Sequence, residues 1–157
     1  MHTRVSGFSL VELMVVLTVV AILATLAAPS FNQAIEGQRA KSAATDLYIA
    51  LSRARSEAIT RNTNVTLSPV SGNWAHGWQI PDPGTGTLIE NHDALKGNLT
   101  VTPSAAGGIV YRSSGRIQAA GTASFSIAGT YASSARCVCV SLSGRPAILE
   151  GVCTTSC

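Results

Sequence analysis

Charged residues are scarce in this chain of 157 residues, and the few that occur are nearly balanced in sign. Asp, Glu, Lys and Arg make up 12% of the sequence, about half of the roughly 25% found in an average soluble domain. The formal net charge of +3 is too small to indicate nucleic-acid binding by itself. Part of the deficit comes from one N-terminal apolar run, and the rest from a body rich in Ala, Ser, Thr and Gly.

The sequence also lacks the motifs of common enzymes and metal sites. Its histidines, His2, His76 and His92, do not have the spacing of metal ligands. No Ser-His-Asp or Cys-His arrangement stands out, and there is neither a P-loop nor a G-x-G-x-x-G fingerprint. We therefore predict that the protein is not an enzyme and that it uses no cofactor or metal.

The apolar run follows a short polar leader. Residues 8–28 would form a helix roughly 32 Å long, which is enough to cross a hydrocarbon core of about 30 Å. A secretory signal has a shorter apolar core that is followed by a small-residue cleavage site, whereas here the polar segment comes first. Arg4 in the leader favours a cytoplasmic N-terminus, so the rest of the chain is expected outside the cytoplasm.

Glu12 places a carboxylate inside this run, where a charged side chain costs roughly 2.5–3.5 kcal/mol on insertion scales. If the leader is cut after Gly7, Phe8 gains a free α-amine. In a bundle of such helices, Glu12 of one subunit can pair with that amine of the next, so that each charge compensates the other. The alternative is an unpaired Glu12 at the membrane edge that reaches toward the lipid headgroups.

The stretch GFSLVELMVVLTVVAILATLAAPSF resembles the N-terminus of type IV pilins and type II secretion pseudopilins. The matching features are Gly7 before the cut, Phe8 as the first mature residue, Glu12 as its fifth and Pro29 near the end of the run. The resemblance implies that a prepilin peptidase removes the leader and methylates Phe8. It also implies a single-pass inner-membrane protein with a periplasmic C-terminal domain, which an assembly platform builds into a filament with other pilins.

After Pro29 the helical pattern resumes. Leu47, Leu51, Ala54 and Ala58 recur at spacings of 4, 3 and 4, which predicts the buried face of an amphipathic helix. We expect one helix over residues 8–61, with Pro29 and Gly37 as candidate bend positions. The basic residues of its second half spread around the helix and are expected to form a solvated face: Arg39, Lys41, Arg53, Arg55 and Arg61.

Past Asn62 the periodicity changes to short strand-like runs separated by turn-forming stretches. The runs are residues 64–69, 77–80, 85–90, 98–102, 108–112, 123–128, 136–142 and 145–150. Trp74 and Trp78 are expected to pack inside this body rather than to stack on bases. The predicted fold class is α+β, a long helix packed against a small antiparallel β-body. The expected segments are a leader (1–7), a membrane or filament-core helix (8–28), its amphipathic continuation (29–61) and a β-rich domain (62–157).

This body resembles a branch of the same family, the GspH/FimT-type minor pilins and pseudopilins. The resemblance rests on three stretches in this order: WAHGWQI at 74–80, GIVYRSSGRI with ASFSI within 108–127, and RCVCVSLSGRPAIL at 136–149. It implies a minor subunit that primes, caps or modifies a type IV pilus. The alternatives are a minor pseudopilin of type II secretion and a pilus-associated DNA-binding subunit for natural transformation.

Family members that take up DNA carry a C-terminal G-R-x-R motif whose arginines contact DNA phosphates. Here Gly144 and Arg145 match, but Ala147 replaces the second arginine, which weakens the inference because arginine forks match phosphate geometry. Three further arginines, expected nearby on neighbouring strands, are candidate contacts: Arg112, Arg116 and Arg136. We favour the alternative, in which Ser143-Gly144 is a hairpin turn and Arg145 is a solvated side chain beside it.

The cysteines all lie near the C-terminal end, at Cys137, Cys139, Cys153 and Cys157. Outside the cytoplasm they predict disulfides. A zinc site is the alternative, but the C-x-C and C-x3-C spacings are not the usual C-x2-C pairs. Among the three connectivities that four cysteines permit, we favour Cys139–Cys153 with Cys137–Cys157, because a strand and a returning C-terminal segment would run antiparallel.

Overall fold

The computed structural model describes residues 9–104 and 107–154, with the backbone alone for residues 26–29 and 132. One long helix, α1 (Leu10–Thr60), comes first, and eight β-strands follow it in the described residues. The chain divides into two compact units, Met1–Ala34 and Ile35–Cys157, and each contains part of α1.

The first unit contains the apolar part of α1. Side chains at residues 10–25 are exposed on every face of the helix. Within the described part of the chain, α1 is the helix that is long and apolar enough to cross a membrane. An aliphatic surface of this size requires lipid or other apolar helices around it.

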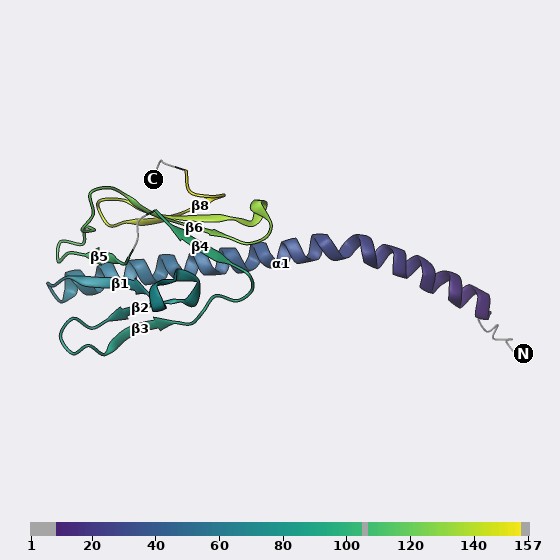
Figure 1. The fold of residues 1–157 in the computed structure, drawn as a ribbon, viewed down its shortest axis with the longest axis horizontal. Coiled ribbons are helices and arrows are strands. Elements are labelled where there is room, and N and C mark those ends of the chain that lie inside the picture. The colour runs from purple at the N-terminus through teal and green to yellow at the C-terminus, as the bar shows by residue number, and fades with distance from the viewer. Residues whose placement is uncertain (1–8, 105–106, 155–157) are drawn as a thin grey trace, which may run out of the picture. The chain divides into compact units, whose positions relative to one another are not determined.

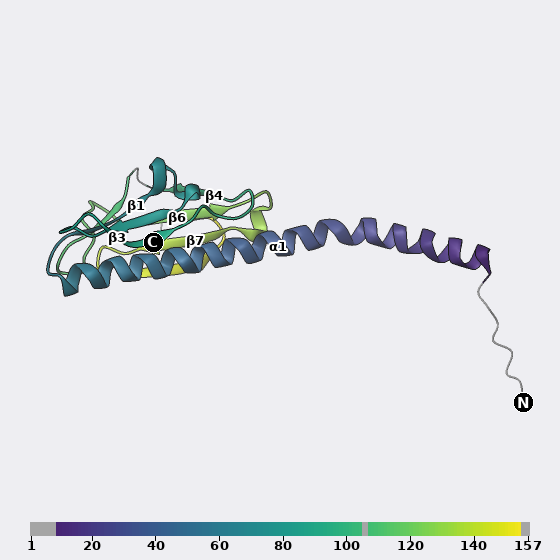
Figure 2. The same cartoon turned by 90° about the horizontal axis from the view of Figure 1, so that it is seen from below.

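The second unit packs the C-terminal part of α1 against two antiparallel sheets (Figures 1 and 2). The first sheet has the order β3-β2-β1-β5 and consists of β1 (Val65–Pro69), β2 (Trp78–Pro81), β3 (Leu88–His92) and β5 (Ile109–Tyr111). The second has the order β4-β6-β7-β8 and consists of β4 (Thr100–Pro103), β6 (Ala123–Ala128), β7 (Arg136–Val140) and β8 (Pro146–Glu150). Short 3-10 helices lie in the connections: η1 (Val70–Gly72), η2 (Trp74–His76) and η3 (Ala132–Ser134).

These elements confirm the predicted α+β class, and each predicted strand-like run overlaps one observed strand. The predicted stripe on α1 is also confirmed, because Leu47, Leu51, Ala54 and Ala58 are all fully buried. The small side chains of alanine let the strands lie close to the helix axis. The β-body is divided into two sheets rather than forming one continuous sheet.

Both tryptophans belong to the core, as predicted. The Trp74 ring in η2 meets the Phe125 ring of β6 edge-on, with 4.7 Å between centroids. This contact joins a connection of the first sheet to the second sheet, and edge-to-face aromatic pairs add to the stabilisation from burial itself. The tryptophans are therefore structural and not available to stack on a nucleic acid.

Candidate functional site

The predicted processing and assembly residues belong to the first unit. Gly7 and Phe8 lie outside the described residues. Glu12 lies in the first turn of α1, where a carboxylate is favoured by the positive end of the helix dipole. Its backbone N–H donates to Ser9 Oγ (3.3 Å), so Ser9 caps the helix, and S-x-x-E is the spacing of a capping box. This S-x-x-E spacing is a sequence signal for a local role of Glu12 at the start of α1, in addition to its predicted role in assembly.

Two glycine turns bring three of the candidate arginines to one end of the second unit. Gly144, with φ +79°, turns β7 into β8 and lies so close to the turn after β5 that a Cβ there would overlap the carbonyl oxygen of Gly115. Arg145 directly follows the turn at Gly144. Arg112 and Arg116 lie on either side of the turn at Gly115, where the Arg112 N–H donates to the Arg116 carbonyl (2.9 Å). The side chains of Arg112, Arg116 and Arg145 are all exposed. We call this part of the second unit the arginine end.

Arg136 lies at the other end of β7. It begins this strand and Val140 ends it, so roughly 13 Å of extended chain separates Arg136 from the turn that carries Arg145. Its Nη1 donates to the carbonyl of Ala135 (2.8 Å). The expectation that Arg136 lies near the other candidate arginines is wrong, because the strand carries the chain away between them.

Arg55 of α1 joins the arginine end instead. Its Nε donates to the Gly115 carbonyl (3.0 Å). A groove of about 410 Å³ opens beside it, lined by Tyr48, Ser52, Arg55, Ser56, Ile59, Arg145 and Pro146. There is no carboxylate in this lining, and neither Arg55 nor Arg145 forms an ion pair with another described residue. We call this recess the basic groove. It can accept an anionic group.

Arg61 and Asp82 connect the end of α1 to the loop between β2 and β3. Asp82 Oδ1 accepts hydrogen bonds from the N–H groups of Gly84 (2.8 Å) and Thr85 (3.1 Å), and the Arg61 guanidinium pairs with both Glu57 and Asp82. The two backbone hydrogen bonds are the largest cause that holds the pKa of Asp82 below its ordinary value. The hydrogen bond and the positive charge of Arg61 lower this pKa further. Arg61 is thus part of an ion-pair network, and this loop is anchored at its start.

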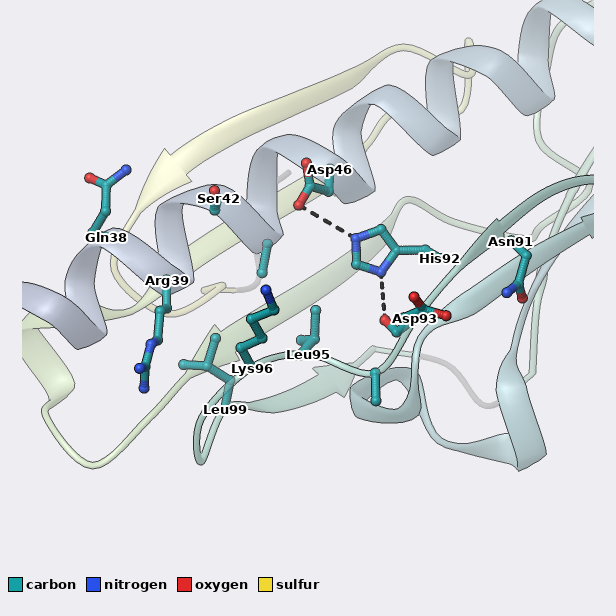
Figure 3. Close-up of a pocket in the computed structure, with 12 residues that line it drawn as sticks. Gln38, Arg39, Ser42, Asp46, Asn91, His92, Asp93, Leu95, Lys96 and Leu99 are labelled. Atoms are coloured by element: carbon teal, nitrogen blue, oxygen red, sulfur yellow. Dashed lines mark hydrogen bonds and ion pairs between the residues drawn. The ribbon is translucent and has the colours of Figure 1, made fainter.

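Another recess of the second unit, of about 530 Å³, lies between α1 and residues 91–99 (Figure 3). His92 stands in its wall with its ring stacked on Trp78 (4.1 Å between centroids). Its Nδ1 lies 2.7 Å from the Asp93 carbonyl oxygen, and its Nε2 lies 3.5 Å from Asp46 Oδ2 on α1. Across the described residues, no group of three His, Cys, Asp or Glu side chains is placed to hold a metal ion. We interpret His92 as a structural link between β3 and α1. No local sequence pattern predicts this link.

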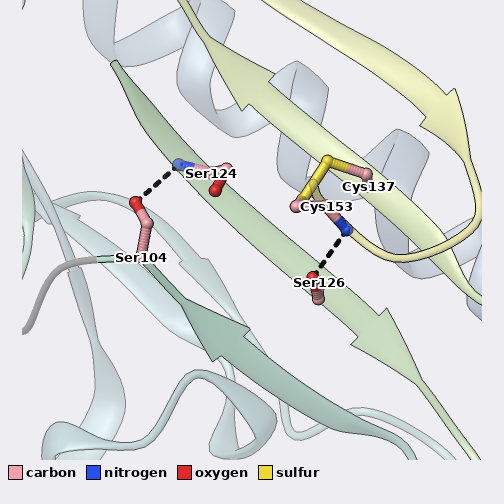
Figure 4. Close-up of a disulfide and its surroundings, with 5 residues drawn as sticks. All are labelled: Ser104, Ser124, Ser126, Cys137 and Cys153. Atoms are coloured by element: carbon pink, nitrogen blue, oxygen red, sulfur yellow. Dashed lines mark hydrogen bonds between the residues drawn. A yellow bond between two sulfur atoms is a disulfide. The ribbon is translucent and has the colours of Figure 1, made fainter. Parts of the chain in front are cut away.

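A disulfide fastens the C-terminal segment to the second sheet (Figure 4). It joins Cys137 of β7 to Cys153, with 5.0 Å between the Cα atoms. The Cys153 N–H donates to Ser126 Oγ (2.9 Å), and Ser126 of β6 lies opposite Cys137 in the strand register. Disulfide formation is therefore confirmed, but the predicted Cys139–Cys153 and Cys137–Cys157 pairs are wrong.

The reason for the different pairing is a second reversal of the chain. After β8, Gly151 adopts φ +82° and donates its N–H to the Ala135 carbonyl (3.0 Å). This turn lies beside the first residue of β7, so the returning segment meets Cys137 before it can reach Cys139. The predicted pairing assumes one reversal of the chain after β7, whereas the structure has two. Cys139 is also disulfide-bonded, whereas Cys157 lies outside the described residues.

The family described as type II transport protein GspH matches residues 43–144, which is more than half of the chain. The chain belongs to the GspH family. The prokaryotic N-terminal methylation motif matches residues 2–28 of this GspH-family protein. No curated protein sequence matches it.

Solved structures of two proteins are similar to this GspH-family fold. The type IV minor pilin FimU of Pseudomonas aeruginosa (strain PAO1) is 22% identical with a TM-score of 0.64, over 72% of this chain and 90% of that chain. The minor pseudopilin EpsH from the type 2 secretion system of Vibrio cholerae is 18% identical with a TM-score of 0.55, over 71% of this chain and 97% of that chain. The predicted family and the predicted pilin fold are thereby confirmed.

Proposed function

We propose that this GspH-family protein is a minor pilin subunit that primes, caps or modifies a type IV pilus. The observation that carries the proposal is a methylation motif at residues 2–28 on a helix whose side chains at residues 10–25 are all exposed. Such a helix is stable in lipid or among similar helices, where close packing replaces contact with water. The protein then acts by assembly and not by catalysis.

The proposal assigns a role to each segment of the chain. Residues 1–7 are the leader, residues 8–28 the membrane and filament-core helix, residues 29–61 its continuation, and residues 62–157 a periplasmic β-rich domain. A prepilin peptidase cuts between Gly7 and Phe8, and an inner-membrane platform inserts the mature chain among other pilins. The Cys137–Cys153 disulfide supports an oxidising compartment for the β-rich domain.

A minor pseudopilin of type II secretion is the second candidate. The description of the family as type II transport protein and the likeness to EpsH favour it. Deletion of the gene separates the two candidates, because loss of surface pili with normal protein secretion supports the pilus subunit. Loss of secretion with normal pili supports the pseudopilin and overturns the first proposal.

Processing is the first testable consequence of either role. We expect the assembled protein to begin at Phe8 with a methylated amine, as measured by mass spectrometry of its N-terminal peptide. Gly7→Val should retain the leader, because the peptidase must approach the backbone closely at this position, whereas Gly7→Ala should still be cut to some extent. Recovery of the uncut leader from wild-type filaments would contradict this assignment.

DNA binding is an alternative function, and the arginine end of the second unit is the observation that favours it. Binding there would be sequence-independent and steeply dependent on salt, because each neutralised phosphate releases a counterion. Arg145→Ala would then lower the affinity for all sequences and flatten the salt slope by about one unit. Arg136→Ala is the matched control, since Arg136 lies at the other end of β7.

We expect no measurable DNA binding at near-physiological salt, because Ala147 leaves the arginine pair of the G-R-x-R motif incomplete. The measurement is an anisotropy titration of the detergent-solubilised protein with labelled duplex DNA. Clear binding by the wild type that Arg145→Ala abolishes and Arg136→Ala retains would establish the DNA-binding function instead.

A further inference from the structure

β8 is an open edge strand with aliphatic side chains on both faces. It ends the second sheet, and four of its five residues are exposed, including Ile148 (39%) and Leu149 (48%). β4, at the other edge of this sheet, exposes Thr100 and Thr102 instead. Among the features that usually protect an edge strand, β8 has Pro146 at its start and Glu150 at its end but no lysine, and the exposed aliphatic residues between them favour pairing with a further strand.

The register of β8 identifies the backbone groups that face away from β7. At one end of this hairpin the Ser141 N–H donates to the Arg145 carbonyl (3.1 Å), and at the other the Gly151 N–H donates to the Ala135 carbonyl (3.0 Å). Hydrogen-bonded and non-bonded pairs alternate along an antiparallel ladder. The odd-numbered residues of β8 therefore bond to β7, and its even-numbered residues point their backbone groups outward.

Those outward groups suit the addition of one more strand. Ile148 and Glu150 each present an N–H and a C=O at the open edge, and Pro146 presents a C=O. Proline lacks an N–H, and at Pro146 that missing group would have pointed outward, so the β7–β8 ladder is intact. An extended peptide can thus form main-chain hydrogen bonds along this edge, as in β-augmentation.

The basic groove lies at the start of this edge, because Arg145 and Pro146 are part of its lining. Its guanidinium groups, on Arg55 and Arg145, have no carboxylate partner among the described residues. An incoming segment that supplies an Asp or Glu here would form charge-assisted hydrogen bonds with a guanidinium fork. A DNA backbone could bind the two arginines, but it would not cover the aliphatic side chains of β8 or hydrogen-bond to its outward backbone groups. An extended peptide can make all three kinds of contact, so it matches more of the surface.

We propose that the edge of β8 and the basic groove receive an extended segment of a neighbouring filament subunit. The segment adds to the sheet as a strand, with apolar side chains beside Ile148 and Leu149 and a carboxylate directed at Arg55 and Arg145. This inference rests on the proposed function as a filament subunit. It assigns to β8 a lateral contact of the second unit, separate from the contacts of the N-terminal helix.

Site-specific photocrosslinking of the full chain in cells tests this contact. With a photoreactive phenylalanine at position 149, we expect an adduct in the filament fraction whose peptide map identifies a segment of another pilin-type subunit that contains Asp or Glu. The same probe at position 88 is the matched control, because Leu88 is 52% exposed on β3, an edge strand of the other sheet. We expect no such adduct from position 88.

A blocking substitution provides the second arm of this test. Ile148→Lys places a charge at the open edge, as natural edge strands do to prevent pairing, and it should remove the adduct from position 149, whereas Leu88→Lys should leave it unchanged. Thermal unfolding of both lysine variants verifies that they fold like the wild type. An adduct that persists in Ile148→Lys, or that forms with lipid, nucleic acid or a second copy of this chain, would overturn the proposal.

The two proposals fail in different ways. If the protein enters filaments but position 149 gives no subunit adduct, the β8 contact is wrong and the proposed function stands. If the wild-type protein is absent from the filament fraction, the proposed function falls, and the β8 contact falls with it.

Discussion

Glu12→Ala should remove most of this protein from filaments while the second unit remains folded. In the proposed assembly, the Glu12 carboxylate of one subunit pairs with the Phe8 amine of the next in an apolar surrounding. Removing one partner of a buried ion pair costs about 3–5 kcal/mol, because the other charge is left uncompensated. This corresponds to a loss of roughly two to four orders of magnitude in the assembly equilibrium, since each 1.4 kcal/mol is about a factor of ten. Immunoblots of sheared filaments against whole cells measure the ratio.

The capping contact at the start of α1 supplies the control for this experiment. Ser9→Ala removes the acceptor for the Glu12 N–H, which costs about 1 kcal/mol, but it keeps the carboxylate. Glu12→Gln keeps the size of the side chain and removes its charge, so it should behave like Glu12→Ala. If Ser9→Ala lowers incorporation as much as Glu12→Ala does, helix capping explains the effect. Incorporation of Glu12→Ala at the wild-type level would show that the charge pair is not needed.

The helix and the strands were predictable because their signals are local. The spacing of Leu47, Leu51, Ala54 and Ala58 identifies the buried face of α1 from a dozen residues of sequence, and Gly- and Pro-rich stretches mark where each strand ends. The N-terminal motif is equally local, since all of its features lie within one apolar helix and the leader before it. These signals do not depend on which strand pairs with which.

The parts of the candidate site that sequence did not predict depend on contacts between distant segments. Arg55 reaches the Gly115 carbonyl only because α1 and the turn after β5 lie side by side. Arg136 and Arg145 are close in sequence, yet an intervening strand holds them apart. His92 links Asp46 to Trp78 through a contact that joins three elements. Side-chain type and spacing along the chain cannot specify such arrangements, because strand order and register decide them.

The disulfide has the second large expected effect. Cys153→Ser should lower the free energy of unfolding of the second unit by about 2–4 kcal/mol. The bond closes a loop with a sequence separation of 16. In the chain-entropy model, cross-linking a loop of about this length reduces the entropy of the unfolded chain and so stabilises the folded state by roughly 3 kcal/mol. Denaturant titrations followed by circular dichroism, performed without reductant, measure the difference.

Reduction and peptide mapping decide whether the bond itself is responsible. In reductant, the wild type and Cys153→Ser should unfold at the same denaturant concentration, because neither then contains the cross-link. A difference that persists would assign the loss to packing of the Cys153 side chain. Mapping of the oxidised wild type should recover Cys137–Cys153, and since Cys139 is also oxidised, we expect Cys139–Cys157 as the second pair. Recovery of Cys139–Cys153 would instead mean that the turn at Gly151 does not direct the returning segment to the first residues of β7.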